Sequence, residues 1–162
     1  MAIDIGRGAD NAPDWEQTGG YTIISTTNPA NATGTLDVME IWCYAHDGAG
    51  IKIGTFSGSG TSYTSRDFES IGAVTQGSKQ TFTGKNCDVV TGDFIGEYGT
   101  AGPGLYSALG SRYYGAAATD WFDGAAHTYT AQGAYDLALY ATGIASTAPI
   151  PVFMNQYRQR RN

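Results

Sequence analysis

The side chains with the greatest potential for chemistry are concentrated in one short stretch. Cys43 and His46 lie three residues apart, and Cys87 follows much later in the chain. Three soft ligands fall short of the four that a structural zinc site normally uses, and residues 43 and 46 of a strand point to opposite faces. The pattern favours two free thiols in the protein core, although a disulfide between neighbouring strands is also compatible with it.

Hydrolytic catalysis has little support in the sequence. A Ser-His-Asp triad would need one of the two histidines, His46 or His127, and no G-x-S-x-G elbow is present. A glycosidase would need two carboxylates on facing walls of a cleft. The acids within or beside expected strands are explained better as the polar face of an antiparallel sheet. They are Glu40, Glu69, Asp93, Glu97 and Asp136.

Calcium binding is a further alternative that the acidic loops leave open. The candidate ligands are Asp10, Asp14 and Glu16 in one group and Asp120 and Asp123 in another. Neither group follows the D-x-[DN]-x-[DN]-G spacing of a calcium loop, and loop aspartates usually form turns. We therefore predict a protein that is not an enzyme, with no catalytic residue, no metal and no cofactor.

Exposed aromatic side chains could instead bind a ligand by stacking. Several aromatics gather in a Gly- and Ala-rich region where loops are expected to meet. Such residues serve sugar platforms and protein interfaces alike, and we favour an interface or core role over carbohydrate binding. The candidates are Tyr106, Tyr113, Tyr114, Trp121 and Phe122.

The elements that would position these side chains are short strands separated by glycine-rich turns. Glycine accounts for 23 of the 162 residues, charged residues for 15% and hydrophobic residues for 41%. Many glycines and aromatics with few charges are typical of a single domain with many strands and turns. We predict an all-β fold, an antiparallel two-sheet sandwich that is jelly-roll-like.

The stretch 35–56 is predicted to be the central hairpin of this sandwich. Strands 35–45 and 51–56 flank a turn that contains Asp47-Gly48, a strong hairpin signal. The apolar alternation changes parity between Val38 and Met39, which indicates a β-bulge or a strand buried on both faces. Residues 57–62 are predicted to be a flexible loop, and residues 99–118 a long loop with one strand within it. Further strands are predicted at 2–5, 21–24, 63–74, 79–83, 86–90, 94–98, 111–114, 126–130 and 134–141.

The C-terminal residues differ in charge from the rest of the chain. Residues 145–162 contain three arginines and no acid, so they carry +3. The remaining residues hold six basic and 15 acidic side chains and carry −9. Pro149, Pro151 and an apolar cluster precede the arginines, which is typical of an extended arm.

The domain organisation follows from this change in character. We predict a β-sandwich domain at 1–143, beginning with a strand and loop segment at 1–20, and an extended basic C-terminal arm at 144–162. Apolar side chains exposed on an arm favour docking onto a partner, with arginine and aromatic groups as the strongest contacts. The predicted partner-binding residues are Phe153, Met154, Tyr157, Arg158, Arg160 and Arg161.

Charge and hydropathy restrict the partners and the location. The acidic body would repel nucleic acid, so general DNA or RNA binding is not expected. The first ten residues lack the basic start and apolar run of a signal peptide, and no window of about 18 apolar residues occurs. We expect synthesis in the cytoplasm without membrane insertion.

Several segments resemble small single-domain β-sandwich virion proteins of bacteriophages, of the decoration or accessory structural type. They are GGYTIISTTNPANATGTLDVMEIW, GIKIGTF, SRDFESIGAVTQGSKQTF, VVTGDFIGEY and the late YDLALYATG. The resemblance implies a non-enzymatic structural protein of a phage particle, located in the virion, such as a head decoration or cement protein. Its partners would be other virion subunits, either a major capsid or a tail protein, and further copies of itself. The alternative is a carbohydrate-binding adhesion module, including a tail or fibre component, which would bind glycans through the exposed aromatics.

Overall fold

A computed structural model of the chain describes residues 2–11, 19–44, 46–101, 105–115 and 118–146. For 105–111 and 134 it describes the backbone alone. These residues contain ten strands and no helix. The prediction of an all-β antiparallel fold is confirmed.

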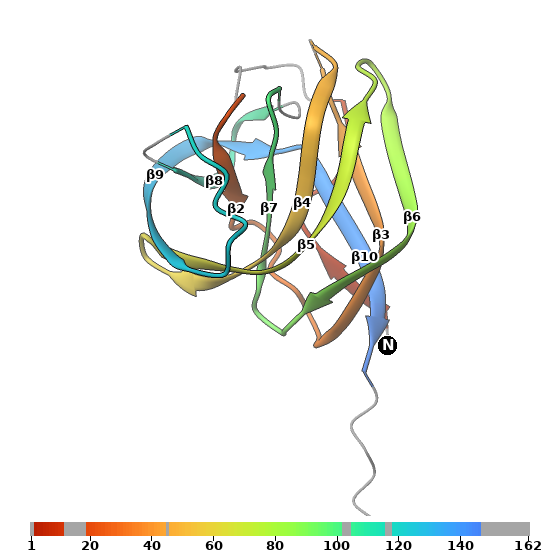
Figure 1. Ribbon diagram of the computed structural model, residues 1–162, viewed down its shortest axis with the longest axis vertical. Helices are drawn as coiled ribbons and strands as arrows, with labels where there is room; N and C mark the ends of the chain where they lie inside the picture. Colours follow the sequence, from red (N-terminus) through yellow and green to blue (C-terminus); the bar gives the residue numbers. More distant parts are fainter. Residues whose placement is uncertain (1, 12–18, 45, 102–104, 116–117, 147–162) are drawn as a thin grey trace, which may run out of the picture.

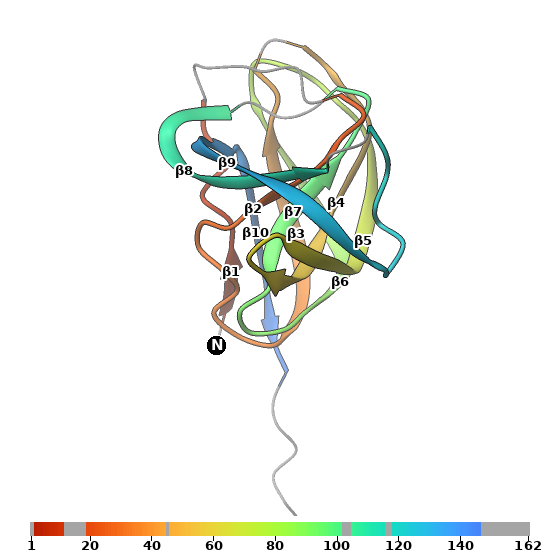
Figure 2. The ribbon, with the colours of Figure 1, turned by 90° about the vertical axis from the view of Figure 1, so that its left-hand side faces the viewer.

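The strands fall into two groups that pack on each other. One is a four-stranded sheet in the order β1-β10-β3-β6, and the other is a closed barrel in the order β2-β7-β4-β5-β9-β8. Figure 1 shows β3, β6 and β10 to one side of the barrel, and Figure 2 shows β8 and β9 crossing the direction of β10. The four-stranded sheet comprises β1 (Ala2–Ile5), β3 (Gly34–Trp42), β6 (Lys79–Val89) and β10 (Leu139–Ala145). The barrel comprises β2 (Thr22–Ser25), β4 (Gly48–Ser59), β5 (Ser62–Val74), β7 (Phe94–Tyr98), β8 (Leu105–Gly115) and β9 (Ala126–Leu137).

Two hydrophobic clusters fill the molecule. The larger lies between the sheet and the barrel wall and includes Leu36, Ile41 and Ile53. The smaller is largely aromatic and contains at least one side chain from every barrel strand, so it fills the barrel interior. Because successive strand residues point to opposite faces, each barrel strand supplies both clusters.

The predicted hairpin at 35–56 is wrong, because its two strands belong to different layers. β3 pairs with β10 and β6, whereas β4 pairs with β5 and β7. A two-residue Asp-Gly hairpin turn of the favoured type needs positive φ at both residues, yet positive φ occurs at Gly50 and not at Asp47 or Gly48. The Asp47 side chain instead accepts the backbone N–H of Gln76 at 2.9 Å. The chain thus leaves the sheet after β3 and enters the barrel at β4.

The tight hairpin lies one connection later than predicted. Ser59 pairs with Ser62, and Gly60 between them has φ of +61°. The glycine-rich residues 57–62 are therefore the paired ends of β4 and β5 with a turn at 60–61, and they are not a flexible loop.

Other strand boundaries also differ from prediction. The two strands expected at 79–83 and 86–90 are one strand, β6, and the expected break at 131–133 lies within β9. β8 begins at Leu105, so it replaces part of the predicted long loop. In each case pairing with a neighbouring strand extends the element through glycine and polar residues that read locally as breaks.

A pair of glycines makes room for the aromatic filling of the barrel. Gly54 on β4 lies opposite Gly96 on β7. A Cβ on Gly96 would lie 2.6 Å from Phe56 Cε2, and a Cβ on Gly54 would lie 2.7 Å from Phe122 Cε1. The Phe56 and Phe122 rings pack together with centroids 5.0 Å apart. The glycines of the GIKIGTF and GDFIG segments are thus spatially paired, and they leave the volume that the rings occupy.

A β-bulge interrupts β3, close to the predicted place. The pairing of β3 with β6 shifts register between Leu36 and Val38, and the pairing with β10 shifts at the same point. Asp37 is the residue without an opposing partner in either ladder. The prediction of a bulge is confirmed, one residue before the expected parity change. Bulges commonly redirect a side chain, and here that side chain is a carboxylate.

Candidate interaction surfaces

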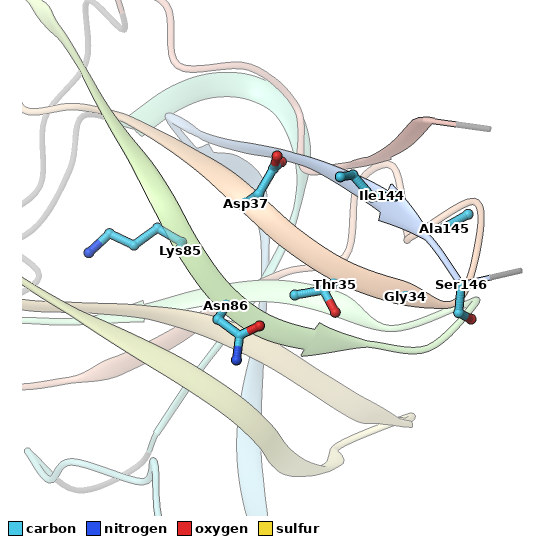
Figure 3. A pocket seen from close by; sticks show the side chains of 8 residues that line it. All are labelled: Gly34, Thr35, Asp37, Lys85, Asn86, Ile144, Ala145 and Ser146. Atoms are coloured by element: carbon cyan, nitrogen blue, oxygen red, sulfur yellow. The ribbon is translucent and has the colours of Figure 1, made fainter.

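A shallow hollow of about 550 Å³ lies at the end of the four-stranded sheet where β10 finishes. β3, β6 and β10 each contribute to its wall, so three strands from distant parts of the sequence define it (Figure 3). We call it the β10-end hollow. Its lining residues are Gly34, Thr35, Asp37, Lys85, Asn86, Ile144, Ala145 and Ser146.

The charged group in this hollow that remains available is Asp37. Its side chain is half-buried, and no described residue forms a hydrogen bond or ion pair with its carboxylate. Lys85, on the same wall, points away from Asp37 in Figure 3 and pairs with Glu69 at 3.6 Å. The bulge therefore presents a partly desolvated carboxylate that has no cation beside it among the described residues. Such a carboxylate favours binding of a basic ligand.

Ile144 supplies an apolar surface beside this carboxylate. Its side chain is 68% exposed, the highest value among the large hydrophobic residues that the structure describes. Ile144 pairs with Ala2 on β1 and Thr35 on β3, so these three side chains share the outer face of the sheet. A surface that combines an exposed isoleucine with an unpaired carboxylate suits a ligand that is both apolar and basic.

The outer face of the same sheet carries further acids. Asp4, Glu40 and Tyr140 lie on it, and the pKa of Tyr140 is raised first by burial and then by the charges of Asp4 and Glu40. Lys79 pairs with Glu40 at 3.1 Å and compensates one of these carboxylates. Asp4 and Asp37 have no such cation among the described residues. The face is therefore negative around the hollow.

The outer edge of β6 is closed by side chains of β5. Asp67 accepts the backbone N–H of Asp88 at 2.8 Å, and Glu69 accepts the N–H of Asn86 at 3.0 Å. Thr55 on β4 donates to the carbonyl of Asp88 at 2.7 Å. These bonds occupy ladder groups that an edge strand would otherwise offer to another chain. The part of β6 around Asn86 and Asp88 is thus protected from strand addition.

The opposite edge of the sheet is covered by a loop. Asn31 Oδ1 accepts the Asp4 N–H at 3.1 Å, and the Asn28 side chain donates to the carbonyl of Gly6 at 2.9 Å. Contacts to this sheet are therefore directed to its outer face and to the β10-end hollow.

The predicted aromatic platform is not assembled as one surface. Tyr113 packs within the barrel against Tyr63 with centroids 5.0 Å apart, whereas its neighbour Tyr114 faces the other cluster and meets Tyr21 edge-on. Phe122 is buried in the barrel. The Tyr106 backbone lies in β8 opposite Asp136, and its side chain is outside the description.

Trp121 is half-buried and holds its own small cluster. The His127 ring stacks on it at 4.5 Å with an interplanar angle of 4°, and Tyr129 meets it edge-on at 4.9 Å. His127 Nε2 lies 3.0 Å from both carboxylate oxygens of Asp123. Two hydrogen bonds lower the pKa of Asp123: the one from the Ala125 N–H has the larger effect, and the one from His127 the smaller. One face of Trp121 is therefore covered by the protein's own histidine, which reduces what a sugar ring could stack on.

The residues considered for metal binding have internal roles. Cys43 and Cys87 are buried free thiols, which confirms the expected state. Burial first, then the charge of Glu97 for Cys43 and of Asp67 for Cys87, raises the pKa of each thiol to about 12. Among the described residues, no three His, Cys, Asp or Glu side chains come together as a metal site.

The acids considered for catalysis or calcium are also engaged separately. Buried Asp93 accepts Arg66 Nε at 2.6 Å and the Val90 N–H at 2.8 Å. Asp120 pairs with Lys52 and accepts the Phe122 N–H at 3.1 Å. Buried Asp136 accepts the Leu137 N–H at 2.8 Å, and Glu97 is buried between sheet and barrel. Asp14 and Glu16 lie outside the described residues.

The residues predicted to form the arm contacts also lie outside the described part of the chain. They are Phe153, Met154, Tyr157, Arg158, Arg160 and Arg161. What the structure does describe is where the preceding segment ends. β10 continues through Ile144 and Ala145, and the Ser146 N–H then donates to the Thr33 carbonyl at 3.0 Å.

The Asp37 bulge is the site residue that the sequence did not single out. The parity change in β3 was the signal that could have identified it. A parity change indicates a bulge, and the side chain at a bulge can point away from its expected face of the sheet.

No family model, curated protein or solved structure matches this chain. Within the described residues, no helix has the length and apolar character needed to cross a membrane.

Proposed function

We propose that this chain is a non-enzymatic structural protein of a phage particle, most simply a head decoration, cement or accessory protein. Its body would act as a rigid block, and its basic C-terminal segment would bind neighbouring subunits. The phage assignment rests on the resemblance of the strand segments to virion β-sandwich proteins. The binding mode rests on the surface of the body.

The observation that carries the proposal is the position of the β10-end hollow. The hollow presents an exposed isoleucine, Ile144, and a carboxylate without a described partner, Asp37, at the place where the basic segment begins. Ser146 is both the last described residue and part of the hollow's wall. Contacts made by the hollow and by the segment would therefore form one continuous interface.

Two further features support a building block over a binding module or an enzyme. Side chains bind the outward backbone N–H groups of β6 at Asn86 and Asp88 and of β1 at Asp4. Association by uncontrolled strand addition is therefore disfavoured. Asp93, Asp120 and Asp136, and His127 with Asp123, are engaged separately in pairs and turns.

The test is immunogold labelling of particles from the source phage, compared with particles that carry a chain truncated after Ser146. This end point retains all of β10. Full-length chain should label the particle at regular positions, and truncation should remove most of the labelling. Full-length protein that is found only free of particles would contradict the proposal. Normal incorporation of the truncated chain would leave a structural protein but exclude the segment as its anchor.

A further inference from the structure

We propose that the β10-end hollow is the receptor for segment 147–162 of a second copy of this chain. This inference rests on the proposed function and makes it more specific, because it names the partner surface. Each copy would then offer one segment and one hollow. Two copies could exchange segments reciprocally in a two-fold dimer, and one-way contacts between successive copies would build rings or extended arrays.

The chemistry of the two sides matches. The hollow offers the Asp37 carboxylate and the apolar Ile144 side chain within one set of lining residues. Segment 147–162 contains Ile150, Val152, Phe153, Met154 and Tyr157, followed by three arginines within its last five residues. An arginine guanidinium can bind a carboxylate through two parallel hydrogen bonds, while aliphatic and aromatic groups cover an exposed isoleucine.

Charge complementarity extends beyond the single pair. Asp4 also lies on the outer face of the sheet, and the structure gives its carboxylate no cation among the described residues. The lysines of this sheet are already used, since Lys79 pairs with Glu40 and Lys85 with Glu69. A segment with +3 charge and no acid is therefore attracted to this face more than to a charge-balanced surface.

Geometry favours a second copy over the segment's own body. The N–H and Oγ of Ser146 both donate to the Thr33 carbonyl, at 3.0 and 3.2 Å, so the start of the segment is fixed at the rim. To occupy its own hollow, the chain would have to reverse at once. Pro149 and Pro151 oppose this, because proline and the residue before it prefer extended backbone. Extended chain from Ser146 to Arg158 spans about 40 Å, which reaches well beyond the hollow.

Intermolecular cross-linking of the full chain tests this directly. One preparation carries Thr35→Cys, inside the hollow, and another carries Asn155→Cys, beside the apolar anchors. The native thiols give little background, because both are buried and have raised pKa values. Mixing the two under mild oxidation should give a disulfide-linked heterodimer, well above the homodimers that each preparation forms alone.

A double variant with both cysteines on one chain defines the alternative. If the mixture yields no heterodimer while the double variant closes within a monomer, the segment binds its own body and the proposal is overturned. If neither product forms, the hollow is not the receptor, and the proposal is overturned as well.

A charge-matched pair of variants tests the role of Asp37. Asp37→Asn should weaken the concentration-dependent association measured by sedimentation about tenfold, because a charge-assisted hydrogen bond is lost. Asp123→Asn removes the same charge from the connection before β9 and should leave the association unchanged. Equal effects would show that overall charge, and not the hollow, drives the association, which overturns the proposal.

The outcome separates this inference from the proposed function. Loss of particle labelling after truncation at Ser146, together with absent cross-links, would support a structural role in which the segment binds a different virion subunit. Presence of cross-links in a protein that never labels particles would support self-association and contradict the phage role.

Discussion

The carboxylate of Asp67 on β5 accepts the backbone N–H of Asp88 on β6 at 2.8 Å. Two residues away on each strand, Glu69 repeats the same contact with the N–H of Asn86 at 3.0 Å. The spacing of two residues matches the alternation of outward N–H groups along a strand edge. Side chains of the barrel thus accept the backbone N–H groups that the carbonyls of a further strand would otherwise accept.

Removing both carboxylates should open this edge. For the double variant Asp67→Ala with Glu69→Ala, we expect the free energy of unfolding to fall by about 1–3 kcal/mol, since three backbone N–H groups lose their acceptors and Lys85 loses its ion pair. We also expect faster aggregation, measured by light scattering and thioflavin T fluorescence, because an open edge templates strand addition. Glu40→Ala is the control, since Glu40 lies on the same sheet but pairs with Lys79. Unchanged aggregation in the double variant would show that the edge is protected by other means.

The paired glycines of the barrel predict an intolerance to a single methyl group. Gly96→Ala should lower the free energy of unfolding by about 1–3 kcal/mol, because the new Cβ would meet the Phe56 ring and the Ile23 carbonyl. Urea denaturation measures this loss. Gly133→Ala on β9 is the matched control, since nothing lies within 4 Å of its added Cβ. A neutral Gly96→Ala would mean that the aromatic filling of the barrel can shift at little cost.

The buried thiols predict a dependence of stability on alkaline pH. Burial raises the pKa of Cys43 and Cys87 to about 12, above the ordinary thiol value of 9.0. A raised folded pKa contributes stability that is fully present below the unfolded pKa and is lost as pH rises toward the folded pKa. The midpoint temperature of thermal unfolding should therefore decrease as the pH is raised from about 9 to about 12. The double variant Cys43→Ser with Cys87→Ser should show a smaller decrease over this pH range.

The same thiols should be unreactive in the native protein. At pH 8, a thiol-specific reagent such as Ellman's reagent should label neither cysteine until urea unfolds the chain, because the thiolate is the reactive form. Rapid labelling of either thiol in native buffer would contradict the burial that the structure describes.

The Asp123–His127 pair predicts a change at acidic pH. The pKa of Asp123 is lowered by the Ala125 N–H and by His127, so its contribution to stability is present above the unfolded pKa and lost as pH falls through the folded pKa. Asp123→Asn should remove that acid transition from the fluorescence of Trp121, which stacks on His127. An identical acid transition in wild type and variant would assign it to other carboxylates.

Carbohydrate binding, the competing hypothesis, has its own test. Because Tyr113 and Phe122 pack in the barrel and His127 covers Trp121, we expect no specific signal on a glycan array. If a signal appears, its loss in Trp121→Ala or Tyr114→Ala would identify the aromatic platform. Binding that depends on either residue would favour the adhesion hypothesis over a purely structural role.

Much of the local structure could be predicted because strand formation depends on short-range pattern. β1, β2, β5 and β7 lie where alternating apolar and β-branched residues indicated them, and the parity change in β3 revealed the bulge within one residue. The free thiols followed from two isolated cysteines in apolar strands. These properties depend on neighbours in the chain, and the sequence displays neighbours directly.

Pairing between strands could not be predicted in the same way. Asp47-Gly48 indicated a hairpin, yet β3 and β4 enter different layers, because each finds more burial against distant strands than against the other. The aromatic residues at 113–122 looked like one surface. Because side chains alternate along β8, Tyr113 and Tyr114 point into different hydrophobic clusters. Gly54 has no side chain and so leaves room for the Phe122 ring inside the barrel.

By itself, the sequence determined an all-β antiparallel body, an acidic charge on that body and a basic, apolar C-terminal segment. Tertiary structure alone decided that six strands close into a barrel and that carboxylates of β5 cap the edge of β6. It also decided that Asp37 and Ile144, more than 100 residues apart, line the same hollow. The reason is physical: strand propensity and net charge are sums over local residues, whereas sheet order and surface chemistry depend on long-range packing that no single segment encodes.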